Sequence, residues 1–290
     1  MALILVSLLF GVNFVMNKIV LHAVSPGAWA FGRIFLTALF MFFIVFVILK
    51  NPFPTGRQWM AIGFLGFFGV VVNQIAFFEG LARTTATHAA IINTSIPVFV
   101  LFFSLISGQE KPEWHRILGM AMGVIGVLIV IEVEKQHFDS ALFLGDFLNL
   151  VNSVSFAFYL YRARTLNRQM NPLVVTTGMF MIGAVGAAAY GGKSIGEVPW
   201  THLPWVVYGS MAFVVLGASV GTYSLNNWAL SKTDSTMVAL YSYIQPVIAG
   251  YLSRFIYYEE LTLRMVIASL FVFAGVALGS MKGTKNYVRS

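Results

Sequence analysis

Arg83-Thr84-Thr85-Ala86-Thr87-His88-Ala89-Ala90 leads into an apolar segment that carries Pro97. A similar stretch, Lys232-Thr233-Asp234-Ser235-Thr236-Met237-Val238-Ala239, leads into a second apolar segment that carries Pro246. The two prolines, like the first threonines of the two stretches, lie 149 residues apart, and no gap is needed to align them. This spacing predicts two copies of one unit, each with a polar hairpin followed by a proline-bearing helix.

The composition restricts the class of protein. Of the 290 residues, 58% are hydrophobic and 10% are charged, and the mean hydropathy is +0.81. A soluble domain carries about 25% charged residues, so the surface of this chain must face lipid. The absence of cysteine excludes disulfides, zinc–thiolate sites and thiol catalysis. The net charge of +7 is explained by cationic loops on the cytoplasmic side, so no nucleic-acid binding is expected.

Apolar segments of about 20 residues are long enough to cross a bilayer as helices. The sequence predicts ten of them, joined by short links with turn-forming residues that leave no room for a soluble domain. The first lacks a basic leader and a cleavage site, so it is expected to be a retained helix and not a signal peptide. The expected spans are residues 2–20, 26–49, 58–82, 86–107, 115–132, 142–163, 171–190, 203–230, 234–256 and 263–281.

The distribution of Lys and Arg predicts the orientation of these spans. Eleven lie on the side that holds both termini and six on the other side, which places both termini in the cytoplasm. Five spans per copy is an odd number, so the two copies must cross the membrane in opposite senses. We therefore expect an all-α integral membrane protein of ten transmembrane helices in two inverted five-helix repeats, residues 1–135 and 136–290. Secondary transporters with this topology bind their substrate near the midplane.

Polar side chains inside spans are costly in lipid and usually face a cavity. They concentrate in the first, third, fourth, sixth, eighth and ninth spans, whereas the fifth and tenth are nearly all Gly, Ala and aliphatic. Amides, hydroxyls and aromatic rings suit a small neutral or zwitterionic metabolite, although any single one is equally compatible with holding two helices together. The candidate substrate-binding residues are Asn13, Asn73, His88, Asn93, Asn152, Tyr159, Tyr223, Asn227, Tyr241 and Gln245.

A few residues within the spans have two interpretations. Pro97 and Pro246 each remove a backbone hydrogen bond, so they are either hinges or tolerated kinks, and we take them as candidate hinges. Arg33 either extends outward to the interface or draws an anionic group inward. His88 either carries a proton or is a hydrogen-bonded structural residue. The side chain of Asp234 is expected to cap the helix that follows it.

The sequence contains one pattern typical of an enzyme. Gly217-Ala218-Ser219-Val220-Gly221 matches a hydrolase nucleophile elbow, but that motif needs a strand–turn–helix context and here it lies inside a long apolar helix. No metalloprotease motif or phosphate-binding loop accompanies it. We therefore expect no enzymatic activity, no metal and no cofactor.

A set of short stretches spread along the chain matches the pattern of a known family. They are Phe10-Gly11-Val12-Asn13-Phe14, Pro26, Arg33, Gly80-Leu81, Ala89-Ala90 with Pro97, and Glu110, and in the second copy Ala229-Leu230, Ala239, Pro246 and Glu259. On these residues the chain resembles the drug/metabolite transporter superfamily, and within it the EamA-like ten-helix transporters, over nearly its full length. The resemblance implies two inverted repeats, alternating access, and export or exchange of small metabolites such as amino acids. Two departures are that the family usually has Trp where Phe10 stands, and that no second arginine corresponds to Arg33.

We therefore expect a secondary transporter that exports small metabolites such as amino acids across the bacterial inner membrane. Its partners would be a small-molecule substrate and the lipid bilayer, with both a monomer and a homodimer left open. The alternative is a membrane receptor or scaffold that binds a ligand or lipid without moving it.

Overall fold

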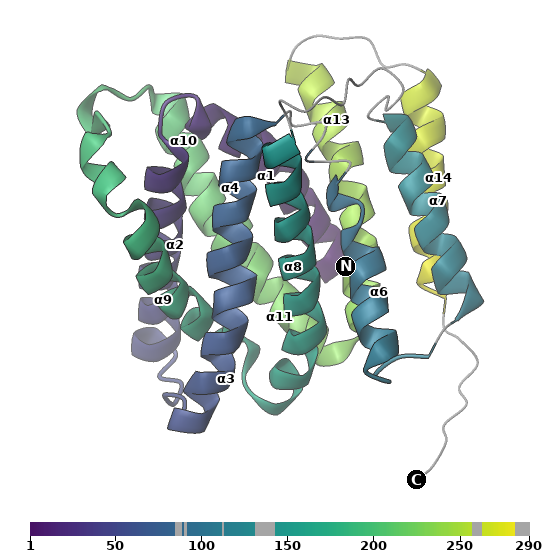
Figure 1. Cartoon of the computed structure of the whole chain (residues 1–290), viewed down its shortest axis with the longest axis horizontal. Helices are drawn as coiled ribbons and strands as arrows, with labels where there is room; N and C mark the ends of the chain where they lie inside the picture. Colours follow the sequence, from purple (N-terminus) through teal and green to yellow (C-terminus); the bar gives the residue numbers. More distant parts are fainter. Residues whose placement is uncertain (85–88, 90–91, 112, 131–142, 257–262, 282–290) are drawn as a thin grey trace.

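The computed structural model describes residues 1–84, 89, 92–111, 113–130, 143–256 and 263–281, and these form helices joined by turns and short links (Figure 1). The α-helices are α1 (Ala2–Leu21), α2 (Pro26–Phe42), α3 (Gly56–Gly66), α4 (Asn73–Arg83), α6 (Ile96–Ile106), α7 (Trp114–Val130), α8 (Phe143–Gln169), α9 (Pro172–Gly191), α10 (Trp205–Phe213), α11 (Thr222–Lys232), α12 (Ser235–Leu240), α13 (Ile244–Ile256) and α14 (Leu263–Gly279). Stretches of π-helix extend α2, join α3 to α4, and join α10 to α11; they are Phe43–Ile48, Phe67–Val72 and Val214–Gly221.

The helices have the length and composition of membrane spans. Within the described residues, 6 continuous helices of 20 to 28 residues are long and apolar enough to cross a bilayer, and shorter apolar helices accompany them. Large hydrophobic side chains such as Phe35, Phe64 and Leu270 are exposed on their outer faces, as lipid contact requires. The chain is therefore an all-α, multi-pass membrane protein of about ten helices, as the sequence predicted.

The expected fourth and ninth spans are interrupted. A turn precedes α6, so Pro97 lies in the first turn of that helix. A short 3₁₀ turn, Tyr241–Tyr243, separates α12 from α13 and comes just before Pro246. Proline is well tolerated in a first turn because its missing N–H has no helical acceptor there. Each proline therefore opens a new short helix instead of bending a long one.

The helices repeat at the spacing of the sequence motif. Residues 73 and 83 bound α4, and residues 222 and 232 bound α11, 149 residues later at both ends. The same offset separates the first and last residues of α7 from those of α14. The chain leaves α4 at Thr84 and α11 at Thr233 in the same extended conformation, with φ of -130° and -139°. Helix ends and local backbone geometry thus recur together.

Close packing of α7 on α14 forms one edge of the molecule, where the two lie side by side (Figure 1). A Cβ atom on Gly119 would come 2.6 Å from the carbonyl oxygen of Gly275, and one on Gly126 would come 2.8 Å from that of Ala268. Higher residue numbers on α7 meet lower numbers on α14, so the two helices are antiparallel. Small residues allow this approach of two backbones, which drives helix association in lipid.

This contact gives a stability prediction. Gly119→Ala should lower the melting temperature in detergent, because the new methyl group must displace a backbone carbonyl, at a cost of about 1–3 kcal/mol. Gly209→Ala, in α10, is the matched control, since nothing lies within 4 Å of its Cβ position. A helical Gly→Ala change without a clash should be neutral or stabilising. Equal melting temperatures for the two variants would contradict the described packing.

Candidate functional site

A cavity lies in the middle of the bundle, with an empty volume of about 530 Å³ that includes the space at its mouth. Its walls come from α1, α2, α4, α8 and α11 and from the segments around Pro97 and Pro246. The lining residues are Phe10, Asn13, Phe14, Arg33, Asn73, Gln74, Phe77, Asn93, Ile96, Asn152, Phe156, Tyr223, Ser242 and Gln245.

Three asparagines form a chain of side-chain amides along one wall. Asn73 Nδ2 donates to Asn152 Oδ1 at 2.5 Å, and Asn152 Nδ2 donates to Asn93 Oδ1 at 3.1 Å. Ser153 Oγ also donates to Asn93 Oδ1 at 2.9 Å. Because a buried amide without a partner is costly in a low-dielectric interior, each asparagine fixes the rotamer of the next. The wall is therefore preorganised.

One hydrogen bond in the cavity joins residues that lie at the spacing of the sequence motif. Gln74 Nε2 donates to the Tyr223 hydroxyl at 2.7 Å, and these residues are 149 positions apart in the chain. The Tyr223 hydroxyl is 3.3 Å from the carbonyl oxygen of Gly69, which it can reach as a donor. The contact therefore links α4 to α11, the two helices whose bounds differ by the same 149 residues.

Aromatic rings form the apolar part of the lining. The ring centroids of Phe10, Phe156 and Tyr223 lie 6.3 to 6.4 Å from one another, and the rings are edge-on. Phe14 and Phe77 make a similar edge-on pair at 5.9 Å. This geometry is the favoured one for aromatic pairs, and it presents ring faces and edges to a ligand.

Arg33 borders the cavity from α2 with only 2% of its surface exposed. Its Nε donates to Ser219 Oγ at 2.8 Å, and its Cζ lies 5.7 Å from the centroid of the Phe78 ring. Ser219 lies in the π-helical stretch between α10 and α11 and donates in turn to the carbonyl of Val214. The glycine–serine pattern is therefore inside a helix, without the strand–turn–helix context of a nucleophile elbow.

A second polar cluster lies farther along α8 and α11. Tyr159 OH donates to Asn227 Oδ1 at 2.9 Å, and Asn227 Nδ2 donates to Thr176 Oγ1 at 2.7 Å. Asn167 Nδ2 also donates to Asn227 Oδ1, at 2.6 Å. All four side chains are at most 2% exposed. Along α8 and α11 this cluster lies between the cavity residues Asn152 and Tyr223 and the end of the bundle at which both helices finish.

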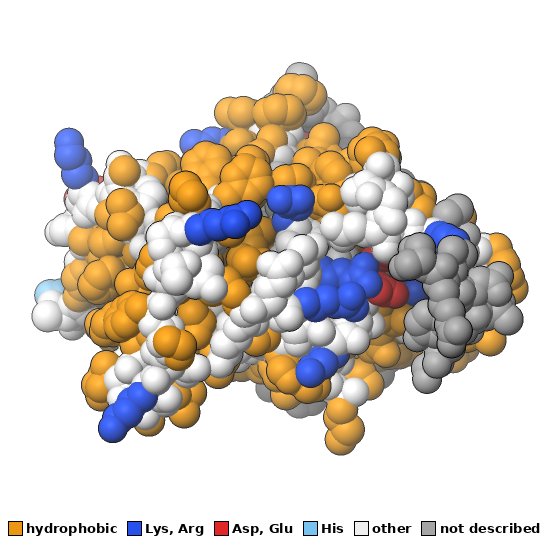
Figure 2. Space-filling view, turned by 90° about the horizontal axis from the view of Figure 1, so that it is seen from below, with side chains coloured by type: hydrophobic (Ala, Val, Ile, Leu, Met, Phe, Trp, Pro, Cys, Tyr) orange, Lys and Arg blue, Asp and Glu red, His pale blue; other side chains and the backbone are white. Residues whose placement is uncertain are grey.

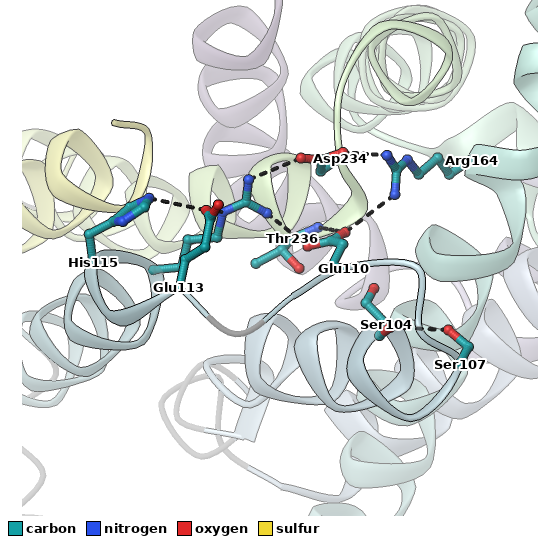
Figure 3. A network of polar contacts seen from close by, with 9 residues as sticks. Ser104, Ser107, Glu110, Glu113, His115, Arg164, Asp234 and Thr236 are labelled. Atoms are coloured by element: carbon teal, nitrogen blue, oxygen red, sulfur yellow. Dashed lines mark hydrogen bonds and ion pairs between the residues drawn. The ribbon is translucent and has the colours of Figure 1, made fainter. Parts of the chain in front are cut away.

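We call that end of the bundle the Asp234 end, and it is the lower end in Figure 1. Figure 2 views it directly and shows Lys and Arg side chains distributed over it, one group lying beside acidic side chains. An ion-pair network lies near this end (Figure 3): Arg116 binds Glu110 at 2.9 Å, Glu113 at 2.8 Å and Asp234 at 3.0 Å, while Arg164 binds Asp234 and lies 3.7 Å from Glu110. The side chain of Glu110 is only 4% exposed.

The network corrects one expectation. Asp234 is at the N-cap position of α12, but its side chain makes no capping hydrogen bond. Both carboxylate oxygens are taken by the guanidinium groups of Arg116 and Arg164. Charge-assisted bonds to two arginines are stronger than one bond to a backbone N–H, which explains the outcome. Glu79 and Arg83, near the opposite end, form an ion pair within α4.

The candidate residues divide into three groups. Six line the cavity: Asn13, Asn73, Asn93, Asn152, Tyr223 and Gln245. Tyr159 and Asn227 belong to the second polar cluster, while Tyr241 packs against the apolar cluster of α7, α13 and α14. His88 lies outside the described residues. The two candidate hinges, Pro97 and Pro246, lie at helix starts beside the cavity.

Sequence reasoning left several lining residues off the candidate list. Gln74 follows Asn73 directly, and its place in the same polar run of α4 was the available signal. Phe10 lies in the stretch that carries the family resemblance, whereas Phe77 and Phe156 gave no signal, because a chain with 27 phenylalanines offers no way to choose between them and the others. The pairing within the network was also hidden, since Arg116 and Asp234 are 118 residues apart.

Comparisons with known proteins identify a family, relatives and a similar fold. The model of the EamA-like transporter family matches residues 1–132 and 143–281. An uncharacterized transporter of Archaeoglobus fulgidus is 27% identical over 97% of this chain and 96% of its own length. An S-adenosylmethionine uptake transporter of Rickettsia felis is 24% identical over 85% of this chain and 80% of its own length. A crystal structure with a TM-score of 0.77 shares the fold at 16% identity, covering 95% of this chain and 94% of that one.

Proposed function

This chain belongs to the EamA-like transporter family, and on that basis we propose that it is a secondary transporter that moves a small polar metabolite across the bacterial inner membrane by alternating access. The observation that carries the proposal is the amide-lined cavity between the two copies, at the point where Gln74 meets Tyr223. The proposal includes no catalytic step. Ser219, the serine of the hydrolase-like pattern, serves in it only to accept a hydrogen bond from Arg33.

We further propose that residues 1–135 and 136–290 are two inverted repeats. The bounds of α11 follow those of α4 by 149 residues at both ends, and the bounds of α14 follow those of α7 by the same number, which supports this division. The antiparallel contact between α7 and α14 supports it as well. Equivalent helices that run in opposite directions are related by a twofold axis perpendicular to them, which is an axis in the membrane plane. In such transporters the two halves rock around a fixed central site.

The two ends of the bundle would then open in turn. In this structure the Asp234 end is held by the ion-pair network, in which Glu110 and Arg116 come from the first repeat and Arg164 and Asp234 from the second. The Tyr159–Asn227 cluster adds a second barrier behind it. In the orientation proposed from the loop charges, this end is cytoplasmic. We propose that the state described is closed to the cytoplasm, and that Pro97 and Pro246 act as hinges.

We propose a zwitterionic metabolite as the substrate, either an amino acid or a molecule that contains one. Amide groups beside aromatic rings suit a ligand with both polar and apolar parts. S-adenosylmethionine, which the Rickettsia felis relative is named for, carries an amino-acid moiety and is therefore a candidate substrate as well. Sequence reasoning favours export, whereas that relative is named for uptake, so the transport assay must measure flux in both directions.

A flux assay tests the function. Purified protein in liposomes should carry at least one labelled compound from a panel of amino acids and S-adenosylmethionine, in exchange for the same unlabelled compound, above the rate of empty liposomes. The panel should be tested in both directions. Saturable binding of a compound by folded protein that never moves it would favour the receptor or scaffold alternative, and it would contradict the proposal.

A second experiment tests the closed end. The chain has no native cysteine, so a single Ala163→Cys reporter, beside Arg164 and fully buried, can be labelled with a maleimide from the Asp234 end. Adding Asp234→Asn should speed labelling several-fold, because it removes the charge that holds both arginines. Glu79→Gln breaks an ion pair near the other end and is the matched control, with no change expected. Unchanged labelling in folded Asp234→Asn would show that the network does not hold this end closed.

A further inference from the structure

Arg33 differs in its surroundings from the two arginines of the ion-pair network. Arg116 contacts the carboxylates of Glu110, Glu113 and Asp234, and Arg164 contacts those of Glu110 and Asp234. Arg33 is more deeply buried, and within the described residues no carboxylate lies within ion-pair distance of it. Its protein partners are the hydroxyl of Ser219 and the face of the Phe78 ring. The fold thus keeps one uncompensated positive charge in the middle of the bundle.

An arginine stays protonated in proteins, so this charge cannot be removed by loss of the proton. A lone charge inside a membrane protein is costly, and such residues face a water-filled cavity or a partner. Arg33 borders the cavity, while the acidic side chains are absent from the lining. The partner that this position lacks must therefore come from the contents of the cavity.

The geometry defines what that partner is. Ser219 accepts the hydrogen of Nε and so holds the guanidinium plane, which leaves the donors on Nη1 and Nη2 without a hydrogen bond to the described residues. Two parallel N–H groups match a carboxylate or a phosphate in bidentate fashion. Arg33 is the only cationic residue in the lining. One positive charge balances a carboxylate but not a doubly charged phosphate.

On these grounds, and resting on the proposed transport function, we propose that Arg33 binds the carboxylate of the transported molecule. The rest of that molecule would face the aromatic part of the lining, where a positively charged amine or sulfonium group can contact the rings of Phe10, Phe156 and Tyr223. The Asn13 and Gln245 amides border the same space and supply further hydrogen bonds. Arg33 is thus the residue that selects acids from their neutral relatives.

The test compares each acid with a partner that lacks the carboxylate. In liposomes, exchange by the parent chain is measured for L-methionine and L-methioninamide, for L-phenylalanine and L-phenylalaninamide, and for S-adenosylmethionine and its decarboxylated form. The carried acid should be preferred by about ten-fold or more, the usual effect of losing hydrogen bonds to a charged group. Arg33→Gln should remove that preference, and Arg33→Lys should keep part of it. Arg57→Gln, at the exposed start of α3, should leave it unchanged.

The outcomes separate this inference from the function on which it rests. Equal rates for acid and amide in the parent chain would overturn the role of Arg33 and leave transport standing. Equal loss of both in folded Arg33→Gln would show a structural role only, and would also overturn it. No flux of any compound by folded parent protein would overturn both proposals. If Arg33→Gln does not fold, Ser219→Ala, which frees the guanidinium but keeps its charge, should weaken the preference for the acid.

Discussion

The structure depends on one constraint, which is that a polar group held away from water in lipid needs a partner inside the protein. The amides of Asn73, Asn93 and Asn152 satisfy one another, and Tyr159, Asn167 and Thr176 all bond to Asn227. The charges of Arg116 and Arg164 are met by Glu110 and Asp234. These hydrogen-bonded and ion-paired side chains lie between the helices and fill the space there. The cavity is the region where polar groups remain available to a ligand.

The same constraint links the fold to movement. Hydrogen bonds between amides fix the wall of the cavity, but the contacts that join the two proposed repeats at the Asp234 end are ion pairs between partly buried charges. Opening that end would hydrate these charges and so offset the loss of the pairs, whereas the amides in the middle of the bundle would lose their partners without replacement. A rigid centre with a releasable closure at one end is what rocking of two halves around a bound molecule requires. The glycine contact between α7 and α14 keeps the two copies together at the edge of the bundle.

Most of the fold was predictable because lipid imposes strong and simple rules on a sequence. The length of the apolar segments marked the membrane spans. The spacing of 149 residues between Pro97 and Pro246 anticipated the same spacing between the bounds of α4 and α11. The division of the fourth and ninth spans was missed, since a proline in an apolar run indicates a kink as readily as a helix start. Six of the candidate residues line the cavity, because polarity inside a span is a direct signal. Pairings such as Asp234 with Arg116 have no local signal, as they depend on contacts between distant segments.

Distances across the two ends of the bundle test the central claim most directly. Spin labels on Ser107 and Arg168 report on the Asp234 end, and labels on His22 and Leu144 report on the end where α4 finishes; all four positions are exposed. Pulsed electron paramagnetic resonance in liposomes should show that Asp234→Asn lengthens the first distance and shortens the second. Two distances that stay fixed, or that lengthen together, would contradict a transporter built from two halves that rock around a shared central cavity.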